Sequence, residues 1–218
     1  PCTFSARLYV DADASGQNTG FSWTDAFPNF QDAIDLARAC GNIAEIWVAQ
    51  GIYLPTRDTT STQFGRHNTF YLPLENLHIY GGFSPGDSLL AQRDWINQPS
   101  ILSGDIGTPN DSTDNAYHVL FIDRVDSSTV IDGLHIMHGN ADGSTTSTRH
   151  GGGVYNIVGA NGETSFPVFR NCTFAHNHAH YGGAIANYAS NAANVNLLIE
   201  RSIFEYNSAD SAGGAIYN

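Results

Sequence analysis

Residues 174–179 read FAHNHA and are followed at 182–187 by GGAIAN, while residues 204–209 read FEYNSA and are followed at 213–218 by GGAIYN. The Phe and Asn positions recur after 30 residues, because 174 becomes 204 and 177 becomes 207. The Gly-Gly pair recurs after 31 residues, because 182 becomes 213. A period in this range, built from short apolar runs between Asn and Gly turns, is typical of a solenoid in which each repeat forms one coil.

A looser copy of the repeat reads IMHGNA at 136–141 and, after a longer loop, GGGVYN at 151–156. One coil cannot bury its apolar side chains alone, so equivalent residues of successive coils should stack. The repeats predict one inward column from the first half of the unit and a second column from its Gly-Gly half. The first column is Ile136, Phe174 and Phe204, and the second is Val154, Ile185 and Ile216.

The Asn residues of the repeat have a predicted structural role at the corners of the coils. Asn tolerates left-handed backbone and can hydrogen-bond to an Asn of the next coil. The paired glycines are expected to allow a turn that a Cβ would obstruct. The predicted ladder residues are Asn140, Asn177 and Asn207, then Asn156, Asn187 and Asn218, with Gly182, Gly183, Gly213 and Gly214.

One amphipathic helix is predicted near the N-terminus. Asn29 can cap its start, apolar residues recur at helical spacing from Phe30 to Ala37, and Gly41 can end it. The rest of the chain shows short β-rich runs bounded by Gly, Asn, Asp or Pro. The sequence therefore predicts an all-β, right-handed parallel β-helix of about five coils. Residues 1–44 would be an N-terminal strand and a helical cap that plugs the stack, and residues 45–218 the β-helix, continuing beyond the end of this chain.

Composition excludes several partners. The chain has 9 basic residues, all of them Arg, against 21 acidic ones, for a formal charge of -12. A chain with this balance and no basic cluster lacks the means to neutralise phosphates, so nucleic acid is not expected as a partner. No apolar run approaches the roughly 20 residues that a membrane-spanning helix needs.

Several N-terminal motifs carry a resemblance to a known group. IWVAQGIY at 46–53, YGGF at 80–83, QRD at 92–94 and LSGD at 102–105 are similar to the opening of right-handed parallel β-helix domains in secreted surface proteins of Bacteroidetes-type bacteria. The Phe-x-x-Asn and Gly-Gly-Ala-Ile units resemble repeats of the polymorphic outer-membrane protein family. The resemblance implies an exported, extracellular or cell-surface protein, often with a sorting domain far downstream.

The leading functional hypothesis is a structural and adhesive rod that contacts glycans or surface proteins through the side loops 56–68, 107–115 and 142–150. A polysaccharide lyase or glycoside hydrolase is the first alternative. The second is a filament subunit that stacks through an uncapped C-terminal end. The enzyme question stays open, although the absence of a convergent catalytic set favours a non-enzymatic role.

Catalytic candidates exist for both enzymatic readings. A lyase needs a base, and because the chain has no Lys the candidates are Arg149, His150 and His138, which otherwise are polar loop residues. A hydrolase needs paired carboxylates. The candidates near strand ends are Asp105, Asp123, Asp126 and Asp132, which otherwise are ordinary turn residues.

Metal and cofactor sites are weakly indicated. His176, His178 and His180 alternate and would share one side of an extended segment, as zinc or copper ligands or as a solvated corner. Acidic corners could hold a structural calcium ion, although no spaced calcium motif is present. No other cofactor is expected.

Cysteines and modification motifs leave alternatives open. Cys2 and Cys40 would pair in an oxidising compartment and remain thiols in a reducing one, whereas Cys172 fits a small buried position. Four tripeptides that begin with Asp look like the O-glycosylation motif of the same bacterial group, or are ordinary Asx turns. Their acceptor residues are Thr59, Ser88, Ser112 and Ser211.

Overall fold

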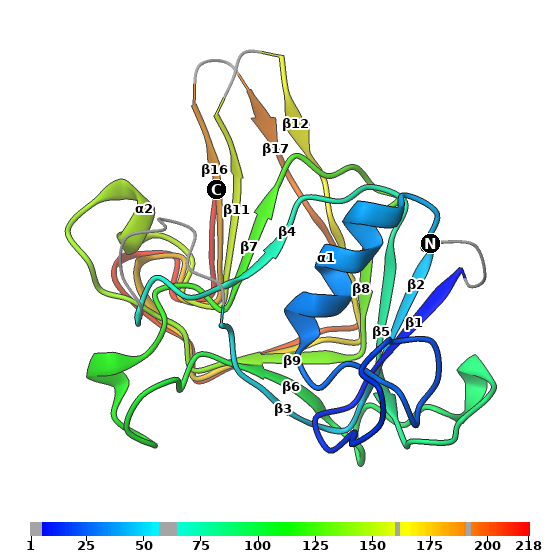
Figure 1. Ribbon diagram of the computed structural model, residues 1–218. Helices are drawn as coiled ribbons and strands as arrows, with labels where there is room; N and C mark the ends of the chain where they lie inside the picture. The colour runs from blue at the N-terminus through cyan, green and yellow to red at the C-terminus, as the bar shows by residue number, and fades with distance from the viewer. Residues whose placement is uncertain (1–5, 57–64, 160–161, 191–192) are drawn as a thin grey trace.

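The protein is a parallel β-helix, as the repeats predict (Figure 1). The computed structural model describes residues 6–56, 65–159, 162–190 and 193–218. Within these residues all of the strand pairings are parallel, and the longest sheet stacks six strands. The stack therefore has about six turns, slightly more than the five expected.

Three long sheets form the walls of the coil in the described residues. The first sheet contains β1 (Arg7–Val10), β2 (Glu45–Ala49), β5 (His78–Phe83), β8 (Val130–Asp132), β13 (Val168–Arg170) and β18 (Leu198–Glu200). The second contains β3 (Gly51–Tyr53), β6 (Ser100–Ser103), β9 (Leu134–Met137), β14 (Thr173–Ala175) and β19 (Ile203–Glu205). The third contains β4 (Phe70–Leu72), β7 (Leu120–Asp123), β11 (Val154–Val158), β16 (Ile185–Ala189) and β21 (Ile216–Tyr217).

Shorter elements connect and extend these walls. Between the second and third sheets lie β10 (Asn140–Ala141), β15 (His178–Tyr181) and β20 (Ser208–Ala212). The paired strands β12 (Thr164–Ser165) and β17 (Asn194–Val195) project beyond the body with the ends of β11 and β16 (Figure 1). The helical segments are α1 (Phe30–Cys40), α2 (Thr146–Arg149), η1 (Leu90–Gln92) and η2 (Ser112–Asp114). The short helix α2 was not predicted, because it lies in a polar loop without apolar periodicity.

Both predicted inward columns are confirmed. Phe174 pairs in register with Ile136 and with Phe204, and the two phenylalanine rings stack with centroids 4.7 Å apart. Ile185 pairs with Val154 and with Ile216 in the same way. Apolar burial along these columns is the main favourable term that holds the coils together.

The predicted N-terminal helix is also confirmed, and it covers one end of the stack. The Asn29 side chain accepts the backbone N–H of Gln31, and Gly41 ends the helix in a left-handed conformation. In Figure 1, α1 lies across the interior of the coil, with Phe30 against Phe70 of the edge strand β4. The Gln31 amide bonds to both the N–H (2.8 Å) and the carbonyl oxygen (3.2 Å) of Tyr71, so α1 satisfies edge groups that would otherwise be open to another strand.

The boundary between the cap and the β-helix stays a prediction. The strand β1 pairs with β2 and is thus the first rung of the first sheet. Cys2 lies outside the described residues, so the Cys2–Cys40 pairing also stays a prediction. Cys172 is a buried free thiol, as expected, and burial raises the pKa of that thiol to about 12.

The left-handed corners do not fall on the predicted asparagines. The residues with positive φ at the corner after the second sheet are His138 (64°), His176 (55°) and Tyr206 (53°), which lie two residues before Asn140 and one residue before Asn177 and Asn207. Asn140 also stands outside the ladder of Asn177 and Asn207, because Asn140 pairs in register with His178 and Gly139 occupies the ladder position. The prediction was wrong at these points because the asparagine side chain, rather than its backbone, has the special role at the corner.

Asn177 shows this role most clearly. Its side chain is 1% exposed, its Nδ2 donates to the Ile136 carbonyl oxygen (2.9 Å), and its Oδ1 accepts from the Gly139 N–H (2.9 Å). Asn207 repeats the arrangement one coil later, donating to the Phe174 carbonyl oxygen and accepting from the Asn177 N–H. Each amide therefore joins one coil to the previous one through backbone groups.

The second asparagine ladder lies inside the third sheet. Asn156 Nδ2 donates to Asn187 Oδ1 (2.8 Å), and Asn187 Nδ2 donates in turn to Asn218 Oδ1. Ser165 Oγ donates to Asn156 Oδ1, so both the donor and the acceptor of this fully buried amide have partners.

The paired glycines of the repeat form the turn that leads into the strands of the third sheet. Gly182 and Gly213 have φ of 67° and 68°, and a Cβ at Gly182 would overlap the carbonyl oxygen of Ile185. Gly183 lies against the carbonyl oxygens of Ser208 and Gly214 in the next coil, so a side chain there would separate the coils.

We expect Asn177→Ala to lower the free energy of unfolding by about 1–3 kcal/mol for each buried backbone group left unpaired. Urea unfolding would measure the loss. Asn194→Ala is the control, because Asn194 is exposed and its replacement should change stability by no more than about 0.5 kcal/mol. Equal losses in the two variants would contradict a special role for Asn177.

Candidate functional site

A row of aromatic side chains runs along the outer face of the third sheet. Tyr71, Phe121 and Tyr155 occupy the same register position on β4, β7 and β11, and their ring centroids are 5.8 and 5.5 Å apart. The next two positions in this column are Ala186 and Tyr217. Side chains alternate between the two faces of a strand, so this column points away from the interior column of Phe70, Leu120 and Val154.

A second outward column lies beside the first. Asp123, Ile157 and Tyr188 are in register on β7, β11 and β16, two residues after the members of the first column. The Tyr155 and Tyr188 ring centroids are 6.2 Å apart, so the two columns touch. We call Tyr71, Phe121, Tyr155, Tyr188 and Tyr217 the aromatic strip.

The loop that carries α2 closes over the middle of the aromatic strip. His150 bridges to Tyr181 and stacks on its ring at 4.9 Å. The small Ala186 lies between Tyr155 and Tyr217 in the column, and the His150 ring lies within 6.1 and 5.8 Å of those two rings. Tyr155 is consequently buried with its hydroxyl unpaired, and burial raises the pKa of that hydroxyl. The accessible part of the strip is therefore on either side of this loop.

His118 anchors the α2 loop through hydrogen bonds to its backbone. Its two ring nitrogens lie 2.9 Å from the Gly151 carbonyl oxygen and 2.7 Å from the Ser147 carbonyl oxygen. These contacts favour the protonated ring, but burial opposes the charge more strongly and lowers the pKa of His118. Burial likewise lowers the pKa of His150 and of His138.

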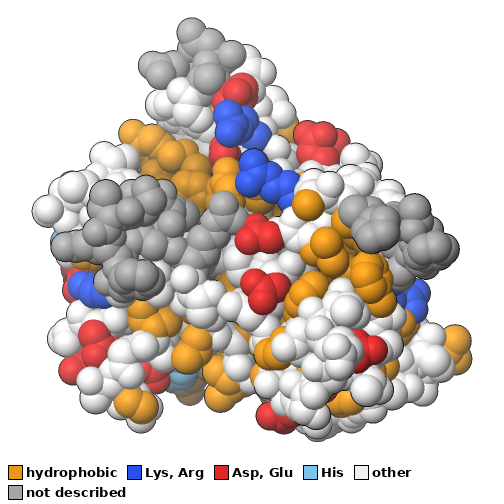
Figure 2. Space-filling view, in the orientation of Figure 1, with side chains coloured by type: hydrophobic (Ala, Val, Ile, Leu, Met, Phe, Trp, Pro, Cys, Tyr) orange, Lys and Arg blue, Asp and Glu red, His pale blue; other side chains and the backbone are white. Residues whose placement is uncertain are grey.

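A hollow of about 290 Å³ opens on the outer face beside Phe121. Within it, Arg124 donates from Nη2 to Asp123 Oδ2 (2.7 Å) and lies with Nη1 3.4 Å from Glu163 Oε1. Figure 2 shows apolar side chains gathered over β7 and β11, with basic and acidic side chains beside them. We call this the Phe121 hollow; its lining residues are Phe121, Asp123, Arg124, Ile157, Gly159 and Glu163.

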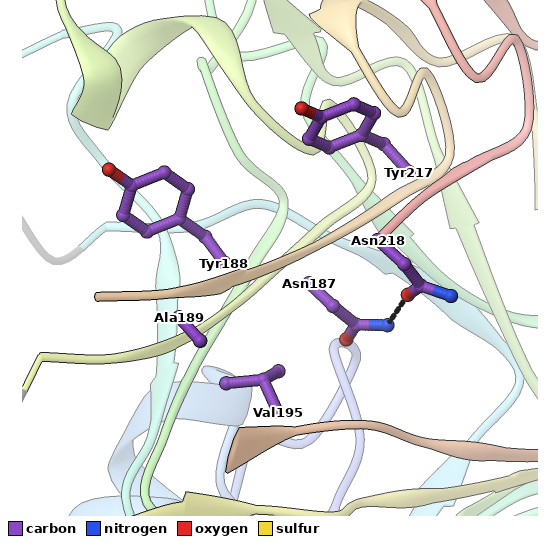
Figure 3. A pocket seen from close by; sticks show the side chains of 6 residues that line it. All are labelled: Asn187, Tyr188, Ala189, Val195, Tyr217 and Asn218. Carbon is purple, nitrogen blue, oxygen red and sulfur yellow. Dashed lines mark hydrogen bonds between the residues drawn. The ribbon is translucent and has the colours of Figure 1, made fainter. Parts of the chain in front are cut away.

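A second hollow, of about 270 Å³, lies at the end of β16 and β21. Figure 3 shows the rings of Tyr188 and Tyr217 on one side of β16 and Asn187, Asn218 and Val195 on the other. This hollow therefore passes around the strand edge and does not form one face.

The residues proposed for a lyase separate into two ring stacks. Arg149 lies over Tyr181 (4.8 Å), the ring on which His150 also stacks, and Tyr181 contacts Tyr217, so these two candidates lie together beside the aromatic strip. His138 stacks instead on His176 and contacts Ser103 Oγ at the corner after β9. Arg149 and His150 are therefore neighbours, and His138 lies apart from them.

The four aspartates proposed for a hydrolase have separate partners. Asp105 accepts from the Asn110 N–H, Asp126 accepts from Ser128, and Asp132 pairs with Arg93. Asp123 lies in the Phe121 hollow, where its carboxylate neighbour is Glu163, a residue that the sequence did not single out.

The three alternating histidines do not share one site. His176 stacks between His138 and Tyr206, whereas His178 and His180 lie 3.4 and 3.3 Å from the Asp210 carboxylate. Among the described residues, no group of three His, Cys, Asp or Glu side chains is arranged to hold a metal ion. The structural calcium stays a prediction.

The predicted glycosylation positions are exposed where the structure describes them. Ser88, Ser112 and Ser211 are exposed, and Thr59 lies outside the described residues. In the Asp111 tripeptide the carboxylate accepts from the Thr113 N–H, which is the Asx turn of the alternative interpretation. Attached sugar stays a prediction.

Comparison with known proteins gives one partial match. Residues 201–218 match the model of the Chlamydia polymorphic membrane protein repeat. These residues form the last coil from the Arg201 corner to Asn218, which supports a β-helix with repeats of this type. No curated protein and no solved structure matches the chain. The resemblance to surface proteins of Bacteroidetes-type bacteria stays a prediction.

In the part of the chain that the structure describes, none of the helices is both long enough and apolar enough to cross a bilayer.

The lowered histidine pKa values predict that the protein loses stability on acidification. A buried histidine stays neutral in the folded chain while its unfolded form takes up a proton below the ordinary pKa of 6.5, so the unfolded state gains from a fall in pH. The free energy of unfolding should be nearly constant between about pH 7 and pH 8, below the range in which the unfolded Cys172 thiol ionises, and should decrease on acidification from about pH 7 to about pH 5, where carboxylates begin to titrate. Urea unfolding as a function of pH would measure this, and His118→Gln should reduce the slope. An unchanged slope in this variant would contradict the assignment to His118.

Proposed function

We propose that this chain is the β-helix part of a surface-exposed adhesive protein and that the aromatic strip binds glycans. The observation that carries the proposal is a row of rings on the outside of a parallel sheet, where charged side chains would suffice for solubility. Phe121, Tyr188 and Tyr217 are only half-buried, so part of each ring faces solvent. Sugar rings present C–H faces that pack on aromatic side chains, while their hydroxyls need polar partners at the edge.

The surface location rests on the repeat. The matched repeat belongs to a family that is named for membrane proteins of Chlamydia, and the sequence resemblance also points to exported proteins. An exported rod with an acidic surface fits a role in contact rather than in nucleic-acid binding. Protease treatment of intact source cells, followed by detection of this β-helix, would test its exposure; full protection would contradict it.

The α2 loop is the side loop that contributes most directly to this surface. Residues 142–150 border the aromatic strip through His150, whose ring lies near those of Tyr155 and Tyr217, and Arg149 lies over the neighbouring Tyr181. The loop 107–115 lies at another corner, where Asp114 accepts from the Thr108 N–H. We therefore centre the proposed contact on this loop together with the outer face of the third sheet. Residues 57–64 of the loop 56–68 lie outside the described residues.

We expect Tyr188→Ala to weaken glycan binding about tenfold, since a well-placed aromatic contact contributes up to about 1.5 kcal/mol. A glycan array with neutral and acidic oligosaccharides would identify ligands, and calorimetry on the strongest binder would give the affinity. Tyr206→Ala is the matched control, because Tyr206 is 75% exposed but stacks on His176 at the opposite corner. Equal affinity of wild type and Tyr188→Ala, or no binding to any glycan, would contradict the proposal.

A further inference from the structure

We propose that the Phe121 hollow is a subsite for an uncharged sugar with neighbouring hydroxyl groups, held by Asp123, Arg124 and Glu163. The inference rests on the proposed glycan binding and names the class of sugar. The three charged groups meet although Glu163 is 39 residues from Arg124 in the sequence, because β7 and β11 are adjacent rungs and Glu163 follows β11.

The charged groups are held in place before any ligand arrives. The Tyr71 hydroxyl donates to Asp123 Oδ2 (3.1 Å), the same oxygen that Arg124 Nη2 contacts. Burial and the Asp123 carboxylate raise the pKa of the Tyr71 hydroxyl. The Asp123 side chain is 17% exposed, whereas the Arg124 side chain is 54% exposed. Asp123 is thus fixed from the sheet side, and the guanidinium group is presented to solvent. Such preorganisation lowers the entropy cost of binding.

The lining matches the chemistry of a sugar. Carboxylate oxygens accept hydrogen bonds from hydroxyls, and a guanidinium group donates from its planar fork to hydroxyl oxygens. Asp123 and Glu163 on either side of Arg124 therefore offer alternating acceptors and donors to neighbouring hydroxyls. Phe121 and Ile157 add apolar surface within the same hollow, which suits the C–H face of the ring.

Charge selects a neutral sugar over an acidic one. The three groups sum to one negative charge, and Arg38, which acts on Tyr71 together with Arg124, balances it, while the whole chain carries -12. The carboxylate of a uronate would therefore gain no net local attraction and would meet the repulsion of the acidic chain. The same arrangement favours binding over hydrolysis, since the guanidinium group bridges the two carboxylates where a scissile bond would have to lie.

The test is calorimetry on the intact chain with the strongest neutral binder from the array, and with tetragalacturonate as an acidic probe. Arg124→Gln and Glu163→Gln should each weaken binding of the neutral oligosaccharide about tenfold, and tetragalacturonate should show no measurable binding. Arg201→Gln is the matched control, because Arg201 also has left-handed φ (49°, against 55° for Arg124) at a distant corner, and it should bind as wild type does. Thermal unfolding would establish that each variant is folded. Because the two variants change separate residues, the proposal can still be tested if one of them does not fold.

The outcomes separate this inference from the proposed function. If Tyr188→Ala weakens binding but Arg124→Gln and Glu163→Gln do not, the subsite assignment is overturned and the glycan-binding strip stands. If the ligands are acidic glycans only, or if tetragalacturonate binds as tightly as the neutral oligosaccharide, the assignment to a neutral sugar is overturned. If no glycan binds at all, both proposals fail together.

Discussion

A buried asparagine amide fixes the register of one coil against the next. Asn177 donates to the carbonyl oxygen of Ile136 and accepts from the N–H of Gly139, and Asn207 repeats both kinds of bond one coil later. Backbone hydrogen bonds between parallel strands can form in more than one register. A buried amide with one backbone acceptor and one backbone donor in the neighbouring coil is satisfied in a single register of the two coils. The stacked Phe174 and Phe204 rings then follow from that register.

Strand register also determines the outer surface, here through the pairing of β7 with β11. Because each strand alternates between interior and exterior, fixing Leu120 and Val154 inside places Phe121 and Tyr155 outside, at a spacing of about 4.8 Å per coil. The α2 loop covers the middle of this row through His150, and the Phe121 hollow remains open beside it. A binding surface arises here from regular stacking, with one loop and one charged cluster added to it.

The sequence was sufficient for the parts of the structure that depend on local pattern. The inward columns and the helix from Asn29 to Gly41 follow from periodicity and capping, which act over a few residues. The corners were misassigned because asparagine was expected to supply the left-handed backbone, whereas His176 and Tyr206 have that conformation and the next residue, Asn, turns its amide inward. The contact of Glu163 with Arg124 was missed because it depends on how far the β11 extension reaches over β7, and no repeat in the sequence marks either residue.

A crystal structure of the protein with its tightest-binding neutral oligosaccharide tests the central claim most directly, namely that the in-register stacking of β7 and β11 builds a sugar site on the outer face of the third sheet. We expect a sugar ring packed on Phe121 and Ile157, with hydroxyls within hydrogen-bond distance of Asp123 and Glu163. A sugar bound instead at the corner of His138, His176 and Tyr206, or away from the third sheet altogether, would contradict this claim.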